Sequence, residues 1–422
     1  MLQHSYISDL KRKLNDNSIT KRDFIRNAVL LGMSASSAYA FGGLIDPDAY
    51  AKKSITKTED ILRIGMKVLP INDPATAAWS SAANQTRHMN EFLAITDPNN
   101  VTKPYLLSGW EVSEDLKSWK LKLRKGIYWS NGDELTSKDI AFNFKRWLDP
   151  KVGSSMAGIF DKLGTYTNNE LIGIRSNALE ILDRYTIVIH LSKPDIAVPE
   201  YLYHYDAGIV HHKFYEWGGD ITKTPVGTGP FLLKSFKTGV YWKMVRNENY
   251  WGDLPPLKEI KYIDYGNDNS AYMRAMWSNQ VDLLYDMPVE LIKNYENEDR
   301  FKIYRKTTSN GPVIKMRSSI EPFNNKNVRK AIQLSINRKE MLNIAQLGYG
   351  TEAEDHMICP IHPEYYKLPM LEQNIEKAKK LIEKEGMKGK KITLYYPNGK
   401  DWFNSGAPLI KQYIEKIGLK VV

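Results

Sequence analysis

Few side chains of this 422-residue chain have the types and spacings that metal binding would need. Cys359 is the single cysteine, which excludes an intramolecular disulfide, and His362 lies three positions after it. No second cysteine or histidine pair completes a zinc set, so we expect both to pack. His211 and His212 are adjacent, and neighbours on a strand point to opposite sides, which makes them a poor ligand pair. The sequence therefore predicts no metal site.

Catalytic motifs are also missing from the sequence. The turn Pro225 to Pro230 contains Gly227 and Gly229, but a phosphate-binding loop would end in Gly-Lys-Ser/Thr at a helix start. We find neither a Gly-x-Ser-x-Gly elbow nor a His-Glu-x-x-His set. We therefore expect no catalytic residue, and we interpret this turn as structural, with glycines that supply positive φ and prolines that fix φ.

The rest of the chain is organised around this turn. Two strand-like runs follow it, Phe231 to Phe236 and Val240 to Val245, and Lys237 to Gly239 separates them. A three-residue loop with a glycine is typical of a β-hairpin. The polar run Asn247 to Tyr250 then ends the hairpin before Trp251.

Alternating and helical periodicities predict a mixed α/β chain. We expect a helix from Thr136 to Leu148, where Thr-Ser-Lys-Asp supplies the N-cap. Further helices are expected over residues 269–277, 327–346, 374–385 and 407–417. Strands are expected over residues 61–69, 119–123, 127–129, 181–191, 281–285, 313–316 and 392–396.

Composition describes a soluble, globular chain with more than one domain. The hydrophobic content is 42%, and a chain of this length exceeds what a single core supports. The formal charge of +10 invites a nucleic-acid hypothesis, yet the basic residues alternate with acids, as in LIEKEGMKGKK. Because there is no basic stripe and no nucleic-acid motif, we exclude a nucleic-acid partner.

The N-terminus is interpreted as an export signal, residues 1–40, followed by a linker over residues 41–60. Lys21 and Arg22 precede an uncharged, mildly apolar run from Asn27 to Ile45, and Ala38-Tyr39-Ala40 is a small-x-small cleavage site. The segment resembles a twin-arginine signal with Lys21 in place of the first arginine, so Sec export stays an alternative. An uncleaved membrane anchor is the other alternative. No cysteine near the cleavage site could carry a lipid, and we expect a periplasmic protein without a lipid anchor.

Three segments together carry a family resemblance: Trp110 to Pro150, Val226 to Trp251, and Phe323 to Ile336. They resemble the extracytoplasmic solute-binding proteins of ABC transporters, in the family 5 group of peptide and nickel receptors. The resemblance implies a periplasmic binding protein-like α/β fold, with two lobes that close on a ligand and an inserted subdomain.

In the domain arrangement that the resemblance implies, the first lobe comprises residues 61–72 and 196–305. The inserted subdomain comprises residues 73–195, and the second lobe comprises residues 306–422. The chain would cross between lobes near Tyr304 to Thr308. Because the sequence stops within an apparent strand and the family pattern continues, we expect a fragment that lacks much of its last lobe.

The implied function is capture of a small solute between the lobes and its delivery to permease subunits in the inner membrane. A di- or oligopeptide is the expected ligand, although the family also takes nickel, haem, opines and sugars. The resemblance implies a monomer that needs no cofactor. A periplasmic hydrolase with a two-lobed substrate cleft is the alternative.

The resemblance also places candidate ligand-binding residues. Lys400 stands near the family's carboxylate-binding arginine, and Trp402 could offer an apolar wall. A lysine holds a carboxylate only as a point charge, so a solvated loop lysine is the alternative. Ile71 and Trp79, which follow the first expected strand, complete the set. The family's aspartate for a peptide amino terminus is expected beyond Val422.

Overall fold

The computed structural model describes residues 4–44, 60–293, 295–306, 308, 311–356, 358–362, 365–397 and 401–422. The chain separates into two compact units, Met1–Tyr285 (unit 1) and Asp286–Val422 (unit 2). No helix among the described residues is both long and apolar enough to cross a membrane. The expected crossing between lobes at residues 304–308 stays a prediction, because compact units need not coincide with ligand-binding lobes.

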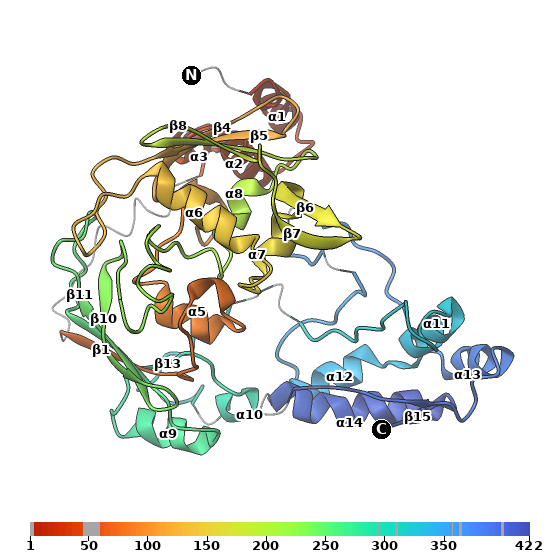
Figure 1. The fold of residues 1–422 in the computed structure, drawn as a ribbon. Coiled ribbons are helices and arrows are strands. Elements are labelled where there is room, and N and C mark those ends of the chain that lie inside the picture. Colours follow the sequence, from red (N-terminus) through yellow and green to blue (C-terminus); the bar gives the residue numbers. More distant parts are fainter. Residues whose placement is uncertain are drawn as a thin grey trace. The chain divides into compact units, whose positions relative to one another are not determined.

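A five-stranded mixed sheet forms one part of unit 1, with strand order β10-β11-β12-β1-β13 (Figure 1). Its strands are β1 (Ile61–Gly65), β10 (Phe231–Lys237), β11 (Tyr241–Arg246), β12 (Glu259–Ile263) and β13 (Leu283–Leu284). β10, β11 and β12 are antiparallel, whereas β12, β1 and β13 run parallel. The predicted hairpin is confirmed, with Gly239 at φ +71° in its loop. The predicted strands over residues 61–69 and 281–285 are correct in place but shorter.

A second sheet of unit 1 has the order β4-β5-β9-β8. Its strands are β4 (Leu107–Val112), β5 (Ser118–Leu123), β8 (Leu179–Asp183) and β9 (Thr186–His190). The predicted single strand over residues 181–191 is wrong, because the backbone N–H of Tyr185 donates to Asp183 Oδ1 (2.7 Å) and the chain turns there. The predicted strand over residues 127–129 is also wrong, since it makes only an isolated bridge between Tyr128 and Glu134.

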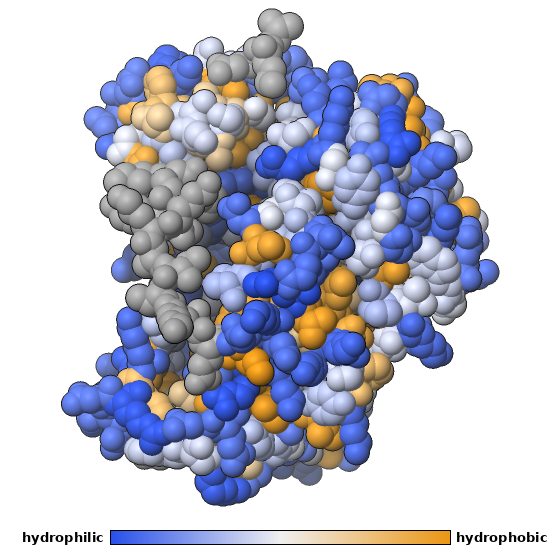
Figure 2. Space-filling view, turned by 90° about the vertical axis from the view of Figure 1, so that its left-hand side faces the viewer, coloured by the Kyte–Doolittle hydropathy of each residue, from blue (hydrophilic) through white to orange (hydrophobic). Residues whose placement is uncertain are grey.

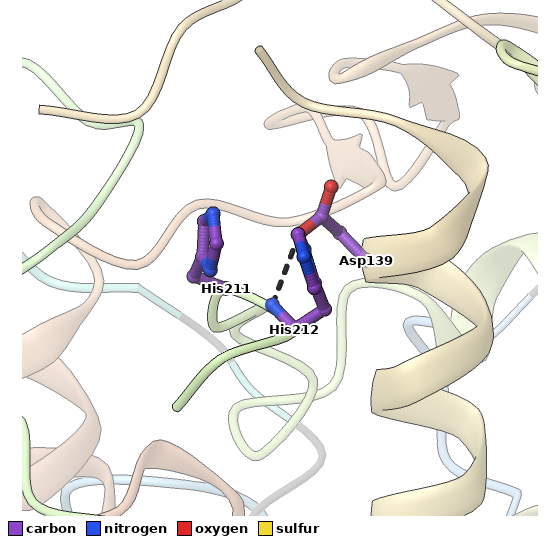
Figure 3. A group of neighbouring side chains, drawn as sticks. All are labelled: Asp139, His211 and His212. Atoms are coloured by element: carbon purple, nitrogen blue, oxygen red, sulfur yellow. Dashed lines mark hydrogen bonds and ion pairs between the residues drawn. The ribbon is translucent and has the colours of Figure 1, made fainter. Parts of the chain in front are cut away.

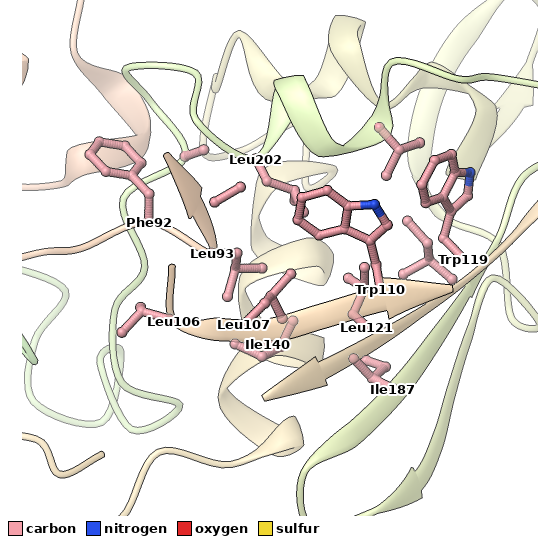
Figure 4. Close-up of a cluster of buried hydrophobic side chains, with 14 of the residues drawn as sticks. Phe92, Leu93, Leu106, Leu107, Trp110, Trp119, Leu121, Ile140, Ile187 and Leu202 are labelled. Atoms are coloured by element: carbon pink, nitrogen blue, oxygen red, sulfur yellow. The ribbon is translucent and has the colours of Figure 1, made fainter. Parts of the chain in front are cut away.

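Helix α6 (Ser137–Trp147) packs against this second sheet and closes the largest core of unit 1. As predicted, Thr136 begins the helix, in a capping box with Asp139. Figure 4 shows part of this core, including Leu121 of β5, Ile187 of β9 and Ile140 of α6. Trp119 and Ile140 are fully buried there, because alternation along β5 and helical spacing along α6 direct them to one interior.

Shorter elements complete unit 1. They are η1 (Pro74–Thr76), α5 (Ser80–Thr86), β2 (Ala94–Thr96), β3 (Thr102–Pro104), α7 (Met156–Ile159), η2 (Asp161–Leu163), β6 (Gly164–Thr167), β7 (Glu170–Ile174), α8 (Val198–Tyr201) and α9 (Asn269–Trp277). The bounds of α9 agree with the prediction. On the face of the chain seen in Figure 2, apolar residues form several small patches separated by hydrophilic residues.

Three helices precede the linker: α1 (Tyr6–Asn15), α2 (Lys21–Leu30) and α3 (Ala35–Gly42). Thr20 caps α2 in a capping box with Asp23, and Ser34 caps α3. The helices share the largest core of unit 1, in which Phe24 and Ala38 are fully buried. The assignment of residues 1–40 to an export signal stays a prediction. Residues 45–59 of the expected linker lie outside the described residues.

The turn at Gly227 and Gly229 is structural, but for a different reason than the sequence suggested. Neither glycine has positive φ. A Cβ at Gly227 would lie 2.2 Å from Met89 O, and one at Gly229 would lie 2.2 Å from His88 O. Both positions therefore need glycine because two backbone segments approach closely, not because of left-handed φ.

The aromatic end of the same segment is tied to a buried carboxylate. Glu91 accepts hydrogen bonds from Trp251 Nε1 (2.9 Å), Tyr250 Oη (2.8 Å) and Tyr105 Oη (2.8 Å). Burial raises the pKa of Glu91 above its usual range, and the three donors oppose that rise. Tyr250 and Trp251 therefore fix the end of the hairpin region to the same segment, residues 88–91, against which the glycine turn packs.

Unit 2 contains α10 (Val289–Ile292), α11 (Lys326–Ser335), α12 (Arg338–Ala345), α13 (Ile375–Lys384), β14 (Lys391–Ile392), α14 (Asp401–Lys416) and β15 (Lys420–Val421). β14 and β15 pair in parallel. The predicted helix over residues 327–346 is wrong as one element, because Ile336 is extended and Asn337 caps a new helix at Glu340 N (3.0 Å). The described residues 313–316 form no strand, and α14 begins earlier than predicted.

Candidate ligand-binding site

Unit 1 offers a candidate site where three parallel strands end together. β12, β1 and β13 are neighbours and run in the same direction, so their carboxyl ends lie at one edge of the sheet. Ligands of open α/β sheets bind beyond this edge. We call Lys67, Asp264, Asn267, Tyr272 and Tyr285 the carboxyl edge.

Asp264, the first residue after β12, organises the carboxyl edge. Its side chain is 5% exposed. Oδ2 accepts a hydrogen bond from Val68 N (2.8 Å), and Oδ1 accepts from Gly266 N (2.8 Å) and Tyr272 Oη (2.9 Å). The bond to Gly266 is the local turn that Asp favours, and Gly266 takes φ +77°. The carboxylate thus joins the chain after β1, the turn after β12 and helix α9.

Lys67 adds a positioned charge to this edge. Its Nζ lies 3.5 Å from Asp264 Oδ1, donates to Asn267 Oδ1 (2.8 Å) and also contacts Gly266 O. These three acceptors match the three N–H donors of an ammonium group. Lys67 is therefore held in place and largely neutralised by Asp264, although its side chain remains 39% exposed.

The exposed part of the carboxyl edge is aromatic. Tyr285 follows β13, donates its backbone N–H to Gly65 O (3.1 Å) and is 45% exposed. Burial raises the pKa of Tyr272 and of Tyr265, so both phenols stay neutral at neutral pH. The arrangement can offer ring faces and backbone groups to a ligand, and it has the character of a binding surface.

Gly65 allows these elements to meet. A Cβ at this position would lie 2.6 Å from Leu284 Cδ2 and 3.1 Å from Tyr272 Cδ1. Only glycine therefore lets β13 and α9 lie this close to the end of β1.

The structure brings two of the predicted ligand-binding residues into one segment of unit 1. Ile71 is 9% exposed and belongs to the core beneath the five-stranded sheet, whereas Trp79 is 47% exposed at the start of α5. The side chain of Gln85 fixes this segment, because it donates to Leu69 O (3.0 Å) and accepts from Leu69 N (2.8 Å). Both ligand-binding assignments stay predictions, and Trp79 has the more accessible side chain.

The other two predicted residues belong to unit 2. Trp402 lies in α14, is half-buried and stacks on Phe403 with ring centroids 3.7 Å apart. Lys400 lies outside the described residues. The roles of both stay predictions.

One group of side chains in the described part of the chain has the composition of a metal site. Ligand atoms of Asp139, His211 and His212 lie within 4.8 Å of one another (Figure 3). However, the two imidazole rings are stacked, with centroids 4.3 Å apart and planes 25° apart. A metal bonds an imidazole nitrogen in the ring plane at about 2 Å, and two nearly parallel planes cannot share such an ion.

The contacts of this group are packing contacts. The expectation that the two histidines point to opposite sides of a strand is wrong, because residues 211 and 212 lie outside any strand and their rings stack. Asp139 Oδ1 accepts from His212 N (3.0 Å) and lies 2.8 Å from His212 Nδ1, while Oδ2 belongs to the capping box of α6. His211 also stacks on Trp217 and meets the edge of Trp129. Burial lowers the pKa of His211, which favours the neutral ring. The histidines therefore tie a loop to the start of α6.

Sequence reasoning missed the carboxyl edge. The residues of β12, EIKYI, alternate in polarity, and Asp-Tyr-Gly-Asn after them is a turn signature. This signal could have located Asp264. It could not have shown that β12 lies beside β1, because almost 200 residues separate the two strands: Ile61 pairs with Glu259.

Comparison with known proteins gives a family match. The sequence-family model for the bacterial extracellular solute-binding proteins, family 5, middle part, matches residues 101–422 of this chain. The periplasmic oligopeptide-binding protein OppA of Haemophilus influenzae is 25% identical over 331 residues, which are 74% of this chain and 61% of OppA. The nickel-binding periplasmic protein of Escherichia coli is 26% identical over 291 residues, 67% of this chain and 53% of that protein. The chain thus spans less than two thirds of the length of either relative.

A solved structure gives the fold. The periplasmic binding protein DppA of Helicobacter pylori, in complex with the peptide STSA, superposes with a TM-score of 0.73 at 21% identity. The match covers 86% of this chain and 73% of DppA. The chain therefore has the mixed α/β fold of periplasmic binding proteins, as predicted.

Proposed function

Because the chain belongs to the family 5 bacterial extracellular solute-binding proteins, we propose that it is the periplasmic substrate-binding component of an ABC importer. Proteins of this family bind their ligands without enzymatic activity, so the alternative of a periplasmic hydrolase is set aside. The inner-membrane permease of such an importer is the proposed partner, and the protein would act as an exported monomer.

The proposed ligand is a di- or oligopeptide. The observation that carries this choice is the aromatic character of the carboxyl edge, where Tyr285 is exposed and Asp264 neutralises Lys67. Ring faces and backbone groups suit a ligand with a repeating amide backbone and variable side chains. OppA and DppA, two of the similar proteins, are named as peptide binders, which supports the same choice. The nickel-binding relative supports a nickel complex as the second candidate.

We further propose that the chain binds by closure of two lobes, residues 61–72 with 196–305 and residues 306–422, with residues 73–195 as an inserted subdomain. Trp79 on the inserted subdomain, and Lys400 and Trp402 on the second lobe, would contact the ligand. Ile71 would support the wall from beneath, because it packs in the core of the sheet.

The experiment uses protein expressed from its own gene and purified without added ligand. Mass spectrometry under native conditions identifies what co-purifies, and calorimetry then titrates a dipeptide library and, separately, a nickel–histidine complex. Trp79→Ala should weaken peptide binding by roughly 10- to 100-fold, as loss of a central aromatic contact does. Tyr166→Ala is the matched control, because Tyr166 is 46% exposed, nearly as much as Trp79, and lies in the hairpin β6-β7.

The outcomes separate the parts of the proposal. Binding of nickel–histidine alone would overturn the peptide assignment and keep the receptor function. Equal peptide affinity of Trp79→Ala and the parent would remove Trp79 from the site. If no member of either ligand class bound to the folded protein, the proposed receptor function for these solutes would be wrong.

A further inference from the structure

The three N-terminal helices share one core with the rest of unit 1, although the sequence predicts that this segment is an export signal. Phe24, Ile25 and Val29 of α2 are at most 1% exposed, and they pack in the same core as the β4-β5-β9-β8 sheet. Ile7 of α1 and Tyr39 of α3 are also 1% exposed. Apolar burial of this extent is the main stabilising term in protein association.

Specific polar contacts fix α2 on unit 1. Trp110 Nε1 on β4 donates to Leu30 O at the end of α2 (2.9 Å) and so satisfies one of the carbonyls that a helix end leaves unpaired. Arg26 Nη2 lies 2.7 Å from Glu200 Oε1 on α8, and Arg26 Nε donates to the same oxygen (2.9 Å). These contacts require one register and orientation of α2.

A buried network fixes α3. Tyr39 Oη donates to the carboxylate of Asp97, and Lys103 Nζ lies 3.2 Å from that carboxylate. The side chains of Lys103 and Asp97 are only 7% and 4% exposed. Burial, together with the hydrogen bond to Asp97, raises the pKa of Tyr39 to about 12. Departure of α3 would take a hydrogen-bond donor, Tyr39 Oη, from the buried carboxylate of Asp97, which is costly.

The predicted cleavage site lies inside this docked segment. Ala38 and Tyr39 belong to α3 and are 0% and 1% exposed. Gly42 packs on Ile25 so closely that a Cβ would lie 2.8 Å from that side chain. A peptidase that reads small-x-small must reach the side chain at the first small position, which here is Ala38. We propose that residues 4–44 dock on the rest of unit 1 as an intramolecular partner that withholds the bond after Ala40 from a processing peptidase.

Cleavage and docking therefore exclude each other. A chain is cut before α3 docks, or it is cut only from the fraction in which α3 has opened. When opening and closing are fast, the rate of cutting follows the population of the open form. The docked helices therefore lower the rate at which the folded chain is cleaved.

The experiment measures cutting of the whole, uncleaved chain by a purified signal peptidase. A synthetic peptide with the sequence of residues 27–50 is the freely accessible reference. We expect the folded chain to be cut at least about 100-fold more slowly than the peptide, the reduction that a mostly closed segment gives. In a urea concentration that unfolds unit 1 but spares the peptidase, the difference should vanish. Equal rates for the folded chain and the peptide would overturn the proposal.

Variants on unit 1 test the docking contacts without changing the cleaved sequence. Glu200→Gln and Asp97→Asn should each speed cutting several-fold, because they weaken the contacts of Arg26 and Tyr39. Glu111→Gln is the control, since Glu111 lies on the same sheet and pairs only with Lys120 and Lys122 among the ion pairs found. Circular dichroism confirms that each variant is folded. Folded variants at positions 97 and 200 that were cut at the rate of Glu111→Gln would also overturn the docking assignment.

Discussion

Replacement of Gly229 by alanine tests whether the glycine turn is needed for close backbone approach. The added Cβ would lie 2.2 Å from His88 O, 2.8 Å from His88 C and 2.9 Å from Met89 O. Ordinary contact begins at 3.4 Å, so the two segments must separate by about 1 Å. The obstacle is backbone, and no side-chain rotation can relieve it.

The cost follows from what this separation breaks. Overpacking of a fixed interior costs about 1 to 3 kcal/mol. The backbone N–H of Gly229 donates to Met89 O (3.0 Å) and that of Phe231 donates to His88 O (3.1 Å). Each hydrogen bond contributes about 1 kcal/mol. We therefore expect Gly229→Ala to lower the free energy of unfolding of unit 1 by about 2 to 5 kcal/mol, a large share of the stability of a typical domain.

Urea unfolding followed by tryptophan fluorescence measures this change. Nine of the ten tryptophans lie in unit 1, so the signal reports mainly on that unit. Gly109→Ala is the matched control, because no atom lies within 4 Å of its added Cβ and its φ is not positive. We expect the control to stay within about 0.5 kcal/mol of the parent. If Gly229→Ala unfolded at the same urea concentration as Gly109→Ala, close approach would not be the reason for the glycine.

Three further predictions concern stability. Burial raises the pKa of Asp206 to about 6, so the folded chain binds this proton more tightly than the unfolded chain. The resulting stability is complete below pH 3.8 and is lost as the pH rises through about 6. Asp206→Asn should therefore flatten the pH dependence of the melting temperature between these two pH values. Arg146→Met leaves Asp73 as an unpaired, largely buried charge and should cost about 3 to 5 kcal/mol in urea unfolding, whereas Lys258→Met at an exposed ion pair should cost less than about 1 kcal/mol. Asn337→Ala removes the cap of α12 and should lower the stability of unit 2 by about 1 kcal/mol, measured by calorimetry on the whole chain.

Local patterns in the sequence predicted the elements whose partners are near in the chain. The β10-β11 hairpin, α6 and α9 were correct because a loop glycine, a capping box or a helical periodicity is contained within each segment. Local sequence signals for an element boundary were weaker where one helix directly follows another, as α12 follows α11. Ile336 is apolar and continues the pattern of α11, so its extended backbone could not be read from periodicity, although Asn337 followed by Glu340 is a start signal for a new helix.

The candidate site depended on information that no single segment contains. Asp264 gains its role because β12 pairs in parallel with β1, which precedes it by almost 200 residues. Strands that pair in parallel are connected by long crossovers, and the residue pattern of one strand does not identify the strand beside it. Ile71 shows the same limit, since an apolar residue after a strand can line a site or fill a core, and here the fold makes it part of the core.

The carboxyl edge also shows how a rigid surface can accept variable ligands. Asp264 has its oxygens occupied by three protein donors and Lys67, so no buried acceptor there requires a particular ligand group. The accessible aromatic surface of this edge comes from Tyr285, and aromatic side chains lose little conformational entropy when a ligand covers them. Contacts of this kind depend on ring area and backbone geometry and not on one side chain of the ligand. We therefore expect affinity at this edge to change less with peptide sequence than with peptide length, because each added residue brings further backbone and surface into contact.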